Sequence, residues 1–237
     1  ADNICRALNA PLVESQGRRY DVEILHGEEA TVYDCASQVA AAIMKAHREH
    51  EGDILAFLPG QAEIMRCQEI LGDSLGSTNV LPLYGMLSPQ QQRRAIMPSR
   101  EGERKVVLAT SIAETSLTIE GVRVVVDSGF CRRMVFDPRS GLSHLDTVRI
   151  SLDMARQRTG RAGRVGEGVC YRLWTLATEH RMDECRKPEI VEADLSSVLL
   201  DISAWGAEDI MSLPWLTPPP QSNVAQARQL LLMLDAI

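Results

Sequence analysis

The sequence predicts an α/β fold with a mostly parallel sheet and flanking helices, followed by a shorter helical unit. Short apolar runs alternate with longer segments that carry apolar residues at helical spacing, and Gly or Pro separates most of them. Such alternation is typical of βαβ units and therefore of a parallel sheet. It stops after Lys187-Pro188, where two amphipathic segments follow. These observations predict a connector at 1–20, an α/β domain at 21–187 and a truncated helical domain at 188–237.

Each expected element rests on a local pattern. Short apolar runs predict strands, which lie at 53–58, 80–84, 105–109, 122–126 and 169–174, and the alternating stretch 22–25 predicts a further short strand. Apolar residues three or four apart predict helices, which lie at 31–50, 61–71, from Ser88-Pro89 onward, and at 151–158, 195–205 and 224–234. Between Arg132 and Arg149 two short stretches flank the turn signal Asp137-Pro-Arg-Ser-Gly141, which predicts a projecting β-hairpin. Residues 230–237 stop inside an apolar helical pattern, so we expect a fragment of a longer protein.

The charge is unevenly distributed. The formal net charge is −7, which by itself argues against a nucleic-acid binder with a basic face. Residues 123–172, however, contain ten arginines, no lysine and five acidic residues, whereas both flanks are acidic. Arginine binds phosphate through a planar fork, so this segment is a candidate anion site, with surface ion pairs as the alternative. Hydrophobic residues make up 45% of the chain, which excludes wholesale disorder, and no apolar run is long enough to span a membrane.

Metal ligands are not clustered. The six cysteines form no C-x-x-C pair, so structural zinc is not expected. We expect them instead to be buried thiols in a reducing cytosol. His47 and His50 share one helical turn, a spacing that suits either a metal or, at a helix C-terminus, a favourable interaction with the helix dipole. No secretory signal is found at the start of the chain.

The densest candidate site is Gln157-Arg-Thr-Gly-Arg-Ala-Gly-Arg164. Its three arginines are spaced by three residues, so on one helical turn they would share a face. Gly160 and Gly163 allow the backbone to approach a ligand closely. Two such arginines can neutralise charge on a phosphoryl group during transfer, as an arginine finger does. The alternative is a solvated basic helix start, which leaves the two glycines unexplained.

A second candidate site, Ala109-Thr-Ser-Ile-Ala-Glu-Thr-Ser-Leu-Thr-Ile-Glu120, directly follows a predicted strand. Five hydroxyl residues and two glutamates crowd a loop at the carboxyl edge of the sheet, where α/β proteins bind ligands. Hydroxyls and loop amides can bind a sugar-phosphate backbone without recognising bases. A helix N-cap at Thr110 or Ser111 is the alternative use of the hydroxyls. The phosphate-binding pattern G-x-x-x-x-G-K-[ST] does not occur in these 237 residues.

Together these motifs closely resemble the second RecA-like domain of the DEAH-box (DEAH/RHA) superfamily 2 helicases. Residues 109–120 resemble helicase motif V and residues 157–164 resemble motif VI, and the two together are highly specific. Phe57-Leu-Pro-Gly60 resembles motif IV, and Pro82-Leu-Tyr-Gly85 with Ser88-Pro-Gln-Gln-Gln92 resembles the stretch that follows it. The resemblance covers nearly the whole chain and implies a RecA-like, P-loop-NTPase-type sheet.

The resemblance also implies roles for the ATP-facing residues. Arg161 and Arg164 would be arginine fingers directed at ATP, with Gln157 on the γ-phosphate side. The residues near the nucleotide would be Thr118, Glu120 and Gly160. Many relatives have Asp at the position of Glu120, so its contact would differ.

Nucleic-acid contacts are implied at the other motifs. They would come from Thr110, Ser111, Gly85, Pro59 and Gly60. Many relatives have Asn at the position of Ser111. The hairpin around Asp137–Gly141 matches the strand-separating element of the family, and the helices after Leu195 resemble the start of a winged-helix domain.

Cofactors and partners follow from the same resemblance. ATP and Mg²⁺ would be held mainly by a first RecA-like domain of the same protein. RNA would be the nucleic acid, with DNA as a second option. The chain itself would hold no metal, bind no membrane, hydrolyse no ATP alone and work in the bacterial cytoplasm. The alternative function is a non-catalytic RNA- or partner-binding module that keeps the fold.

Overall fold

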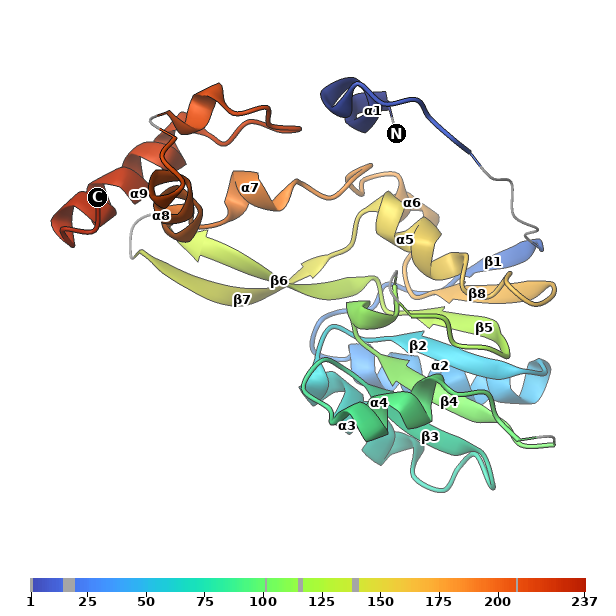
Figure 1. Ribbon diagram of the computed structural model, residues 1–237. Coiled ribbons are helices and arrows are strands. Elements are labelled where there is room, and N and C mark those ends of the chain that lie inside the picture. The colour runs from blue at the N-terminus through green and yellow to red at the C-terminus, as the bar shows by residue number, and fades with distance from the viewer. Residues whose placement is uncertain (1, 15–19, 101, 115–116, 138–140, 208) are drawn as a thin grey trace. The chain divides into compact units, whose positions relative to one another are not determined.

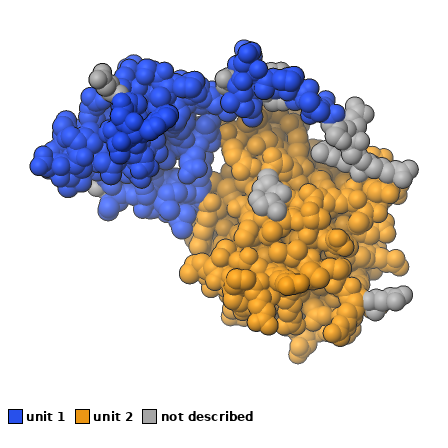
Figure 2. Space-filling model, in the orientation of Figure 1, with its two compact units in different colours: residues 1–17, 133–146, 187–237 blue, residues 18–132, 147–186 orange. Residues whose placement is uncertain are grey.

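The computed structural model describes residues 2–14, 20–100, 102–114, 117–137, 141–207 and 209–237 (Figure 1). The chain divides into two compact units (Figure 2). The sheet unit comprises Arg18–Arg132 and Thr147–Arg186. The helical unit comprises Ala1–Gly17, Arg133–Asp146 and Lys187–Ile237.

A six-stranded sheet forms the centre of the sheet unit, and every neighbouring pair of strands is parallel. Its order is β1-β8-β5-β2-β4-β3, and the strands are β1 (Val22–His26), β2 (Asp53–Phe57), β3 (Asn79–Leu83), β4 (Lys105–Ala109), β5 (Val122–Asp127) and β8 (Gly168–Arg172). Leu55 of β2 lies between Val107 of β4 and Val125 of β5. The predicted parallel sheet is confirmed, and each predicted strand is found within two residues of its expected bounds.

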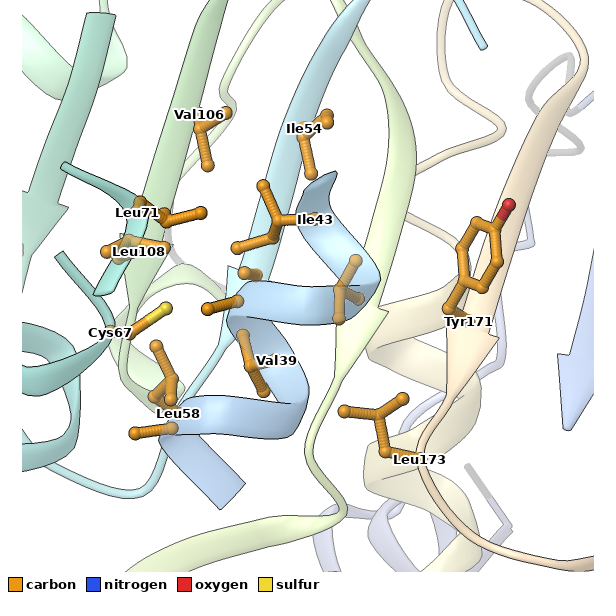
Figure 3. Close-up of a cluster of buried hydrophobic side chains, with 14 of the residues drawn as sticks. Val39, Ile43, Ile54, Leu58, Cys67, Leu71, Val106, Leu108, Tyr171 and Leu173 are labelled. Carbon is orange, nitrogen blue, oxygen red and sulfur yellow. The ribbon is translucent and has the colours of Figure 1, made fainter. Parts of the chain in front are cut away.

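Apolar side chains fill both faces of the sheet around its central strands, which is why segments such as 54–57 and 106–109 are continuously apolar. Ile54 and Ala56 belong to one core cluster, and their neighbours Leu55 and Phe57 belong to the other. Figure 3 shows the first cluster, where Val39 and Ile43 from a flanking helix pack against the strands. The helices of this unit are α2 (Cys35–Glu49), α3 (Gln61–Leu71), α4 (Pro89–Ile96), α5 (Leu152–Thr159) and α6 (Leu176–Glu179).

Two helix starts illustrate local control by polar side chains. The predicted helix 31–50 begins only at Cys35, because the Asp34 carboxylate accepts hydrogen bonds from both the N–H and the hydroxyl of Thr31, each at 2.8 Å. Such a side-chain turn competes with helical backbone bonds. In contrast, α4 begins where expected, since Ser88 and Gln91 form a reciprocal capping box with Pro89 in the first turn.

The predicted hairpin is present as β6 (Phe130–Asp137) and β7 (Leu142–Arg149), which pair only with each other. Gly141 closes its end with a left-handed φ of 69° and donates its N–H to the Asp137 carbonyl at 2.9 Å. Residues 138–140 of the predicted turn lie outside the described residues.

The helical unit has its own small core. Its helices are α1 (Asp2–Leu8), α7 (Glu189–Glu192), α8 (Ser196–Ala204) and α9 (Gln221–Met233). Leu199 and Ile202 of α8 pack with Val224, Ala227 and Leu231 of α9. The two predicted helices are therefore present, whereas α1 was not predicted within the 1–20 segment. The winged-helix assignment stays a prediction.

The histidine and cysteine patterns have ordinary structural explanations. His47 contacts the Thr78 hydroxyl and His50 contacts the Tyr171 hydroxyl, both at 2.8 Å. Among the described residues, no group of three or more metal-ligating side chains is found, and no helix is long and apolar enough to cross a bilayer. Burial raises the pKa of the Cys67 and Cys170 thiols to about 12, so these cysteines act as small apolar side chains.

One carboxylate ties the end of the sheet to α6. A single oxygen of Glu179 accepts hydrogen bonds from His26, Arg172 and Trp174 at 2.8, 2.7 and 2.9 Å. Burial favours its protonated form, but these hydrogen bonds outweigh burial and lower the pKa of Glu179 to about 2. The carboxylate therefore stabilises the fold fully above the unfolded-state pKa of 4.5, and this contribution is lost as the pH falls towards 2.

We expect Glu179→Gln to lower the free energy of unfolding by about 3 kcal/mol at pH 7, since one pKa unit corresponds to about 1.4 kcal/mol. Urea unfolding across a pH series measures this, and the difference from the wild type should shrink between pH 4.5 and 2. The exposed glutamate Glu69, paired with Arg66, offers a control in Glu69→Gln. Identical pH dependence in the wild type and Glu179→Gln would contradict the assignment.

Candidate functional site

Three adjacent strands bring the predicted nucleic-acid contacts to one edge of the sheet. In the order β2-β4-β3, the chain leaves the sheet at Pro59-Gly60, at Thr110-Ser111 and at Gly85. Hydrogen bonds tie these ends together: Leu58 N–H donates to the Ala109 carbonyl at 2.8 Å, and Thr110 N–H donates to the Leu83 carbonyl at 3.1 Å. The carboxyl edge of a parallel sheet is where such proteins bind ligands.

These residues differ in exposure. Gly85 and Ser111 are exposed and Thr110 is half-buried, whereas Pro59 and Gly60 are buried. A Cβ placed on Gly60 would lie 2.6 Å from the guanidinium carbon of Arg132, so the arginine side chain covers this glycine. The exposed polar group beside this strand end is therefore Arg132, which the sequence patterns did not single out.

The hydroxyl-rich loop begins with a single 3₁₀ turn, Ser111–Ala113. Thr110 occupies its N-cap position, but its side chain makes no capping hydrogen bond. The cap therefore does not explain the Thr110 hydroxyl, which stays available for another contact. Residues 115 and 116 of this stretch lie outside the described residues.

The three arginines of the motif at residues 157–164 do not share one helical face, contrary to expectation. Helix α5 ends at Thr159, and the chain continues in tight turns, with Arg161 N–H on the Arg158 carbonyl at 3.0 Å and Ala162 N–H on the Thr159 carbonyl at 3.1 Å. As a result Arg158 is fully buried, Arg161 is 5% exposed and Arg164 is exposed. The three guanidiniums therefore have three different environments.

Arg158 is a core residue held by two carboxylates. Its Nη1 donates to Asp127 at 2.8 Å and to the Phe130 carbonyl at 3.2 Å, and its Nε lies 3.4 Å from Glu114 Oε1. The guanidinium also stacks over Phe57, with 4.7 Å between its central carbon and the ring centroid. Burial alone would lower the pKa of Arg158, but Asp127 and Glu114 raise it, so the side chain is charged.

Arg161 and Arg164 contact the hydroxyl-rich loop. Arg161 donates from Nε to the Glu114 carbonyl at 3.0 Å and from Nη1 to the Leu117 carbonyl at 2.5 Å. Arg164 donates to the Thr118 hydroxyl at 2.8 Å. The structure thus joins the two candidate sites, and it brings the predicted residues Thr118 and Arg164 into contact.

The partners of these two arginines are neutral oxygens. Most other arginines of the basic segment face carboxylates, for example Arg172 on Glu179 and Arg156 on Glu184. Within the described part of the chain, Arg161 and Arg164 form no ion pair within 4.0 Å. The ion-pair alternative therefore accounts for most arginines of the basic segment, and the anion site stays a prediction for Arg161 and Arg164.

The remaining predicted residues lie apart from this contact. Gln157 is exposed and accepts a hydrogen bond from Arg186 at 3.4 Å, and Gly160 is exposed. Glu120 is exposed in the turn before β5, at the opposite edge of the sheet from Thr110. A Cβ on Gly163 would lie 2.5 Å from the Tyr20 carbonyl, so packing within the protein explains this glycine.

Glu114 and Asp127 are the two site residues that sequence reasoning missed as partners. Asp127 is the last residue of the buried strand β5 and Glu114 lies in the loop after β4, and a buried arginine requires such carboxylates. Their pairing joins distant parts of the chain, so no local pattern marks it.

We expect Asp127→Asn to lower the free energy of unfolding by about 3–5 kcal/mol, because it leaves a buried guanidinium with one carboxylate fewer. Urea or thermal unfolding of the chain measures the loss. Arg156→Ala is the matched control. It breaks an exposed ion pair on α5, the helix that carries Arg158, and should leave stability unchanged. A similar loss in both variants would argue against the importance of the buried pair.

The chain as a whole is similar to domains of known helicases. The family model of the helicase conserved C-terminal domain matches residues 36–166. The ATP-dependent RNA helicase HrpB of Escherichia coli (strain K12) is 44% identical over 229 residues, which are 96% of this chain and 28% of HrpB. The pre-mRNA-splicing factor ATP-dependent RNA helicase prp22 of Schizosaccharomyces pombe is 41% identical over 236 residues, covering 96% of this chain and 20% of prp22.

Solved structures give the same result. The crystal structure of the E. coli DEAH/RHA helicase HrpB superimposes with a TM-score of 0.95 at 43% identity, covering the whole chain and 30% of HrpB. A structure of the E. coli DExH-box NTPase HrpB gives 0.91. The chain thus spans less than a third of each relative, and its RecA-like fold and its resemblance to DEAH/RHA helicases are confirmed. Since the family model matches more than half of its residues, this chain belongs to the helicase conserved C-terminal domain family.

Proposed function

We propose that this chain is the second RecA-like lobe of an ATP-dependent RNA helicase. In this role Arg161 and Arg164 act as arginine fingers on ATP that is bound mainly by the first lobe of the same protein. The observation that carries the proposal is that both guanidiniums are held by neutral oxygens of one loop and form no ion pair with a carboxylate of the described residues. The similarity to HrpB and prp22, both named ATP-dependent RNA helicases, supports it.

The fingers fit the charge that develops during phosphoryl transfer. A transferring phosphoryl group spreads negative charge over its oxygens, and positioned guanidiniums stabilise that charge most strongly where water is excluded. Gln157, Gly160, Thr118 and Glu120 would complete the nucleotide side of the lobe. We assign Mg²⁺ and the phosphate-binding loop to the first lobe, because the pattern G-x-x-x-x-G-K-[ST], whose Ser or Thr hydroxyl binds Mg²⁺, does not occur in these 237 residues.

RNA would bind at the group of predicted residues that follow the ends of β2, β4 and β3. Gly85, Thr110 and Ser111 lie at adjacent strand ends and offer amides and hydroxyls to a sugar-phosphate backbone. Pro59 and Gly60 would contribute through the backbone beside Arg132. Such contacts are largely independent of base sequence and weaken with salt. We assign strand separation to the β6–β7 hairpin, with DNA as a second option for the strand.

The rest of the assignment follows from this role. The helical unit would begin a winged-helix domain. We propose the bacterial cytoplasm as the compartment, since ATP and RNA are available there and Cys67 and Cys170 are buried thiols.

In the full-length protein, we expect Arg161→Ala to reduce ATP turnover by about 10³-fold or more, as loss of an arginine finger does. RNA affinity should be retained, because Arg161 is only 5% exposed and its guanidinium donates to the Glu114 and Leu117 carbonyls. Steady-state ATPase assays and RNA titrations measure the two effects. Arg156→Ala, which removes an exposed arginine of the preceding helix α5, is the control. Undiminished turnover in Arg161→Ala would refute the finger assignment.

We expect the isolated 237-residue chain to hydrolyse almost no ATP, because it lacks G-x-x-x-x-G-K-[ST]. Phosphate release at saturating ATP, with and without RNA, measures this. Robust turnover by the chain alone would overturn the two-lobe assignment.

The same missing pattern favours the second candidate function, a non-catalytic RNA- or partner-binding module. A full-length protein that binds RNA but contains no phosphate-binding loop would establish that alternative.

A further inference from the structure

Glu114 is a buried acidic residue to which the proposed function assigns no role. It is 4% exposed, and its Oε1 makes no hydrogen bond to the described residues. The nearest cationic atoms are Arg158 Nε at 3.4 Å and Arg186 Nη2 at 3.9 Å. Burying such a carboxylate is unfavourable unless a compensating charge holds it, so the attraction to Arg158 fixes its place.

The main chain of the same residue orients Arg161. The Glu114 carbonyl accepts from Arg161 Nε at 3.0 Å, and the Leu117 carbonyl accepts from Nη1 at 2.5 Å. Two acceptors on one planar guanidinium determine its direction as well as its position. Glu114 therefore contacts two arginines of the motif at residues 157–164, namely Arg158 through its side chain and Arg161 through its carbonyl.

Backbone hydrogen bonds hold the start of the hydroxyl-rich loop. Glu114 N–H donates to the Ser111 carbonyl at 3.0 Å, and Ala113 N–H donates to the Thr110 carbonyl at 3.2 Å. Arg158 is also bound to Asp127 at the end of β5, since its Nη1 donates to Asp127 Oδ1 at 2.8 Å. The Glu114 carbonyl thus has a defined position relative to the sheet, provided that its carboxylate stays bound to Arg158.

From these contacts we propose that Glu114 is a positioning residue: its buried carboxylate, held by Arg158, fixes the carbonyl that orients the Arg161 guanidinium for catalysis. The inference rests on the finger role of Arg161 proposed above. A shift of about 1 Å in a positioned group can reduce turnover by about 10²-fold, so loss of the Glu114 charge should act on the rate rather than on substrate binding.

The test is a double-mutant cycle in the full-length protein with Glu114→Gln and Arg161→Ala. Glu114→Gln keeps the size of the side chain and removes its charge. We expect kcat for ATP to fall by about 10²-fold with KM for ATP unchanged. In the Arg161→Ala background the same substitution should cause no further loss, because Glu114 acts through Arg161. Glu184→Gln, at an exposed Glu–Arg pair, is the matched control and should leave kcat unchanged.

The outcomes separate the two proposals. If Arg161→Ala alone leaves kcat unchanged, the finger role fails. If Arg161→Ala reduces kcat but Glu114→Gln leaves it unchanged, or reduces it equally in both backgrounds, the finger role stands and the positioning role of Glu114 is overturned. If thermal unfolding shows that Glu114→Gln does not fold, the cycle is run with Glu114→Asp, which keeps the charge on a shorter side chain. Non-additive kcat values then support the proposal, and additive ones refute it.

Discussion

A single buried charge organises the centre of this domain. The Arg158 guanidinium is fully enclosed and can be tolerated there only because Asp127 and Glu114 approach it and Phe57 lies under it. These three partners come from the end of β5, from the hydroxyl-rich loop and from the end of β2. Folding must therefore bring two strand ends, the hydroxyl-rich loop and α5 to one point before the charge is compensated, and the loop geometry around Arg161 follows from that requirement.

The sheet could be predicted from the sequence because burial on both faces makes its central strands largely apolar, as in β2 and β4. Its flanking helices were located by period and by turn residues, with errors where a short polar contact intervened, as at Thr31 and Asp34. The prediction that the three arginines share one helical face was wrong, because α5 ends at Thr159 and the chain continues in tight turns. Helix α1 was missed because its short segment carries no clear apolar period.

The candidate site was less predictable than the fold. Composition placed ten arginines in one segment, but only the structure distinguishes those neutralised by carboxylates from Arg161 and Arg164. The predicted nucleic-acid residues do meet at adjacent strand ends, because strand order in a parallel sheet determines which loops are neighbours. The pairing of Glu114 with Arg158 joins segments far apart in the chain, so it follows from three-dimensional packing alone.

The two glycines of the arginine motif have different causes. Gly163 is demanded by the protein itself, since any larger residue would strike the Tyr20 carbonyl beside β1. Gly160 meets no such restriction: it is exposed, it has ordinary right-handed helical angles, and a Cβ there would make only van der Waals contact at 3.4 Å. The packing of the fold therefore requires glycine at 163, whereas at 160, the C-cap of α5, it has room for a larger side chain.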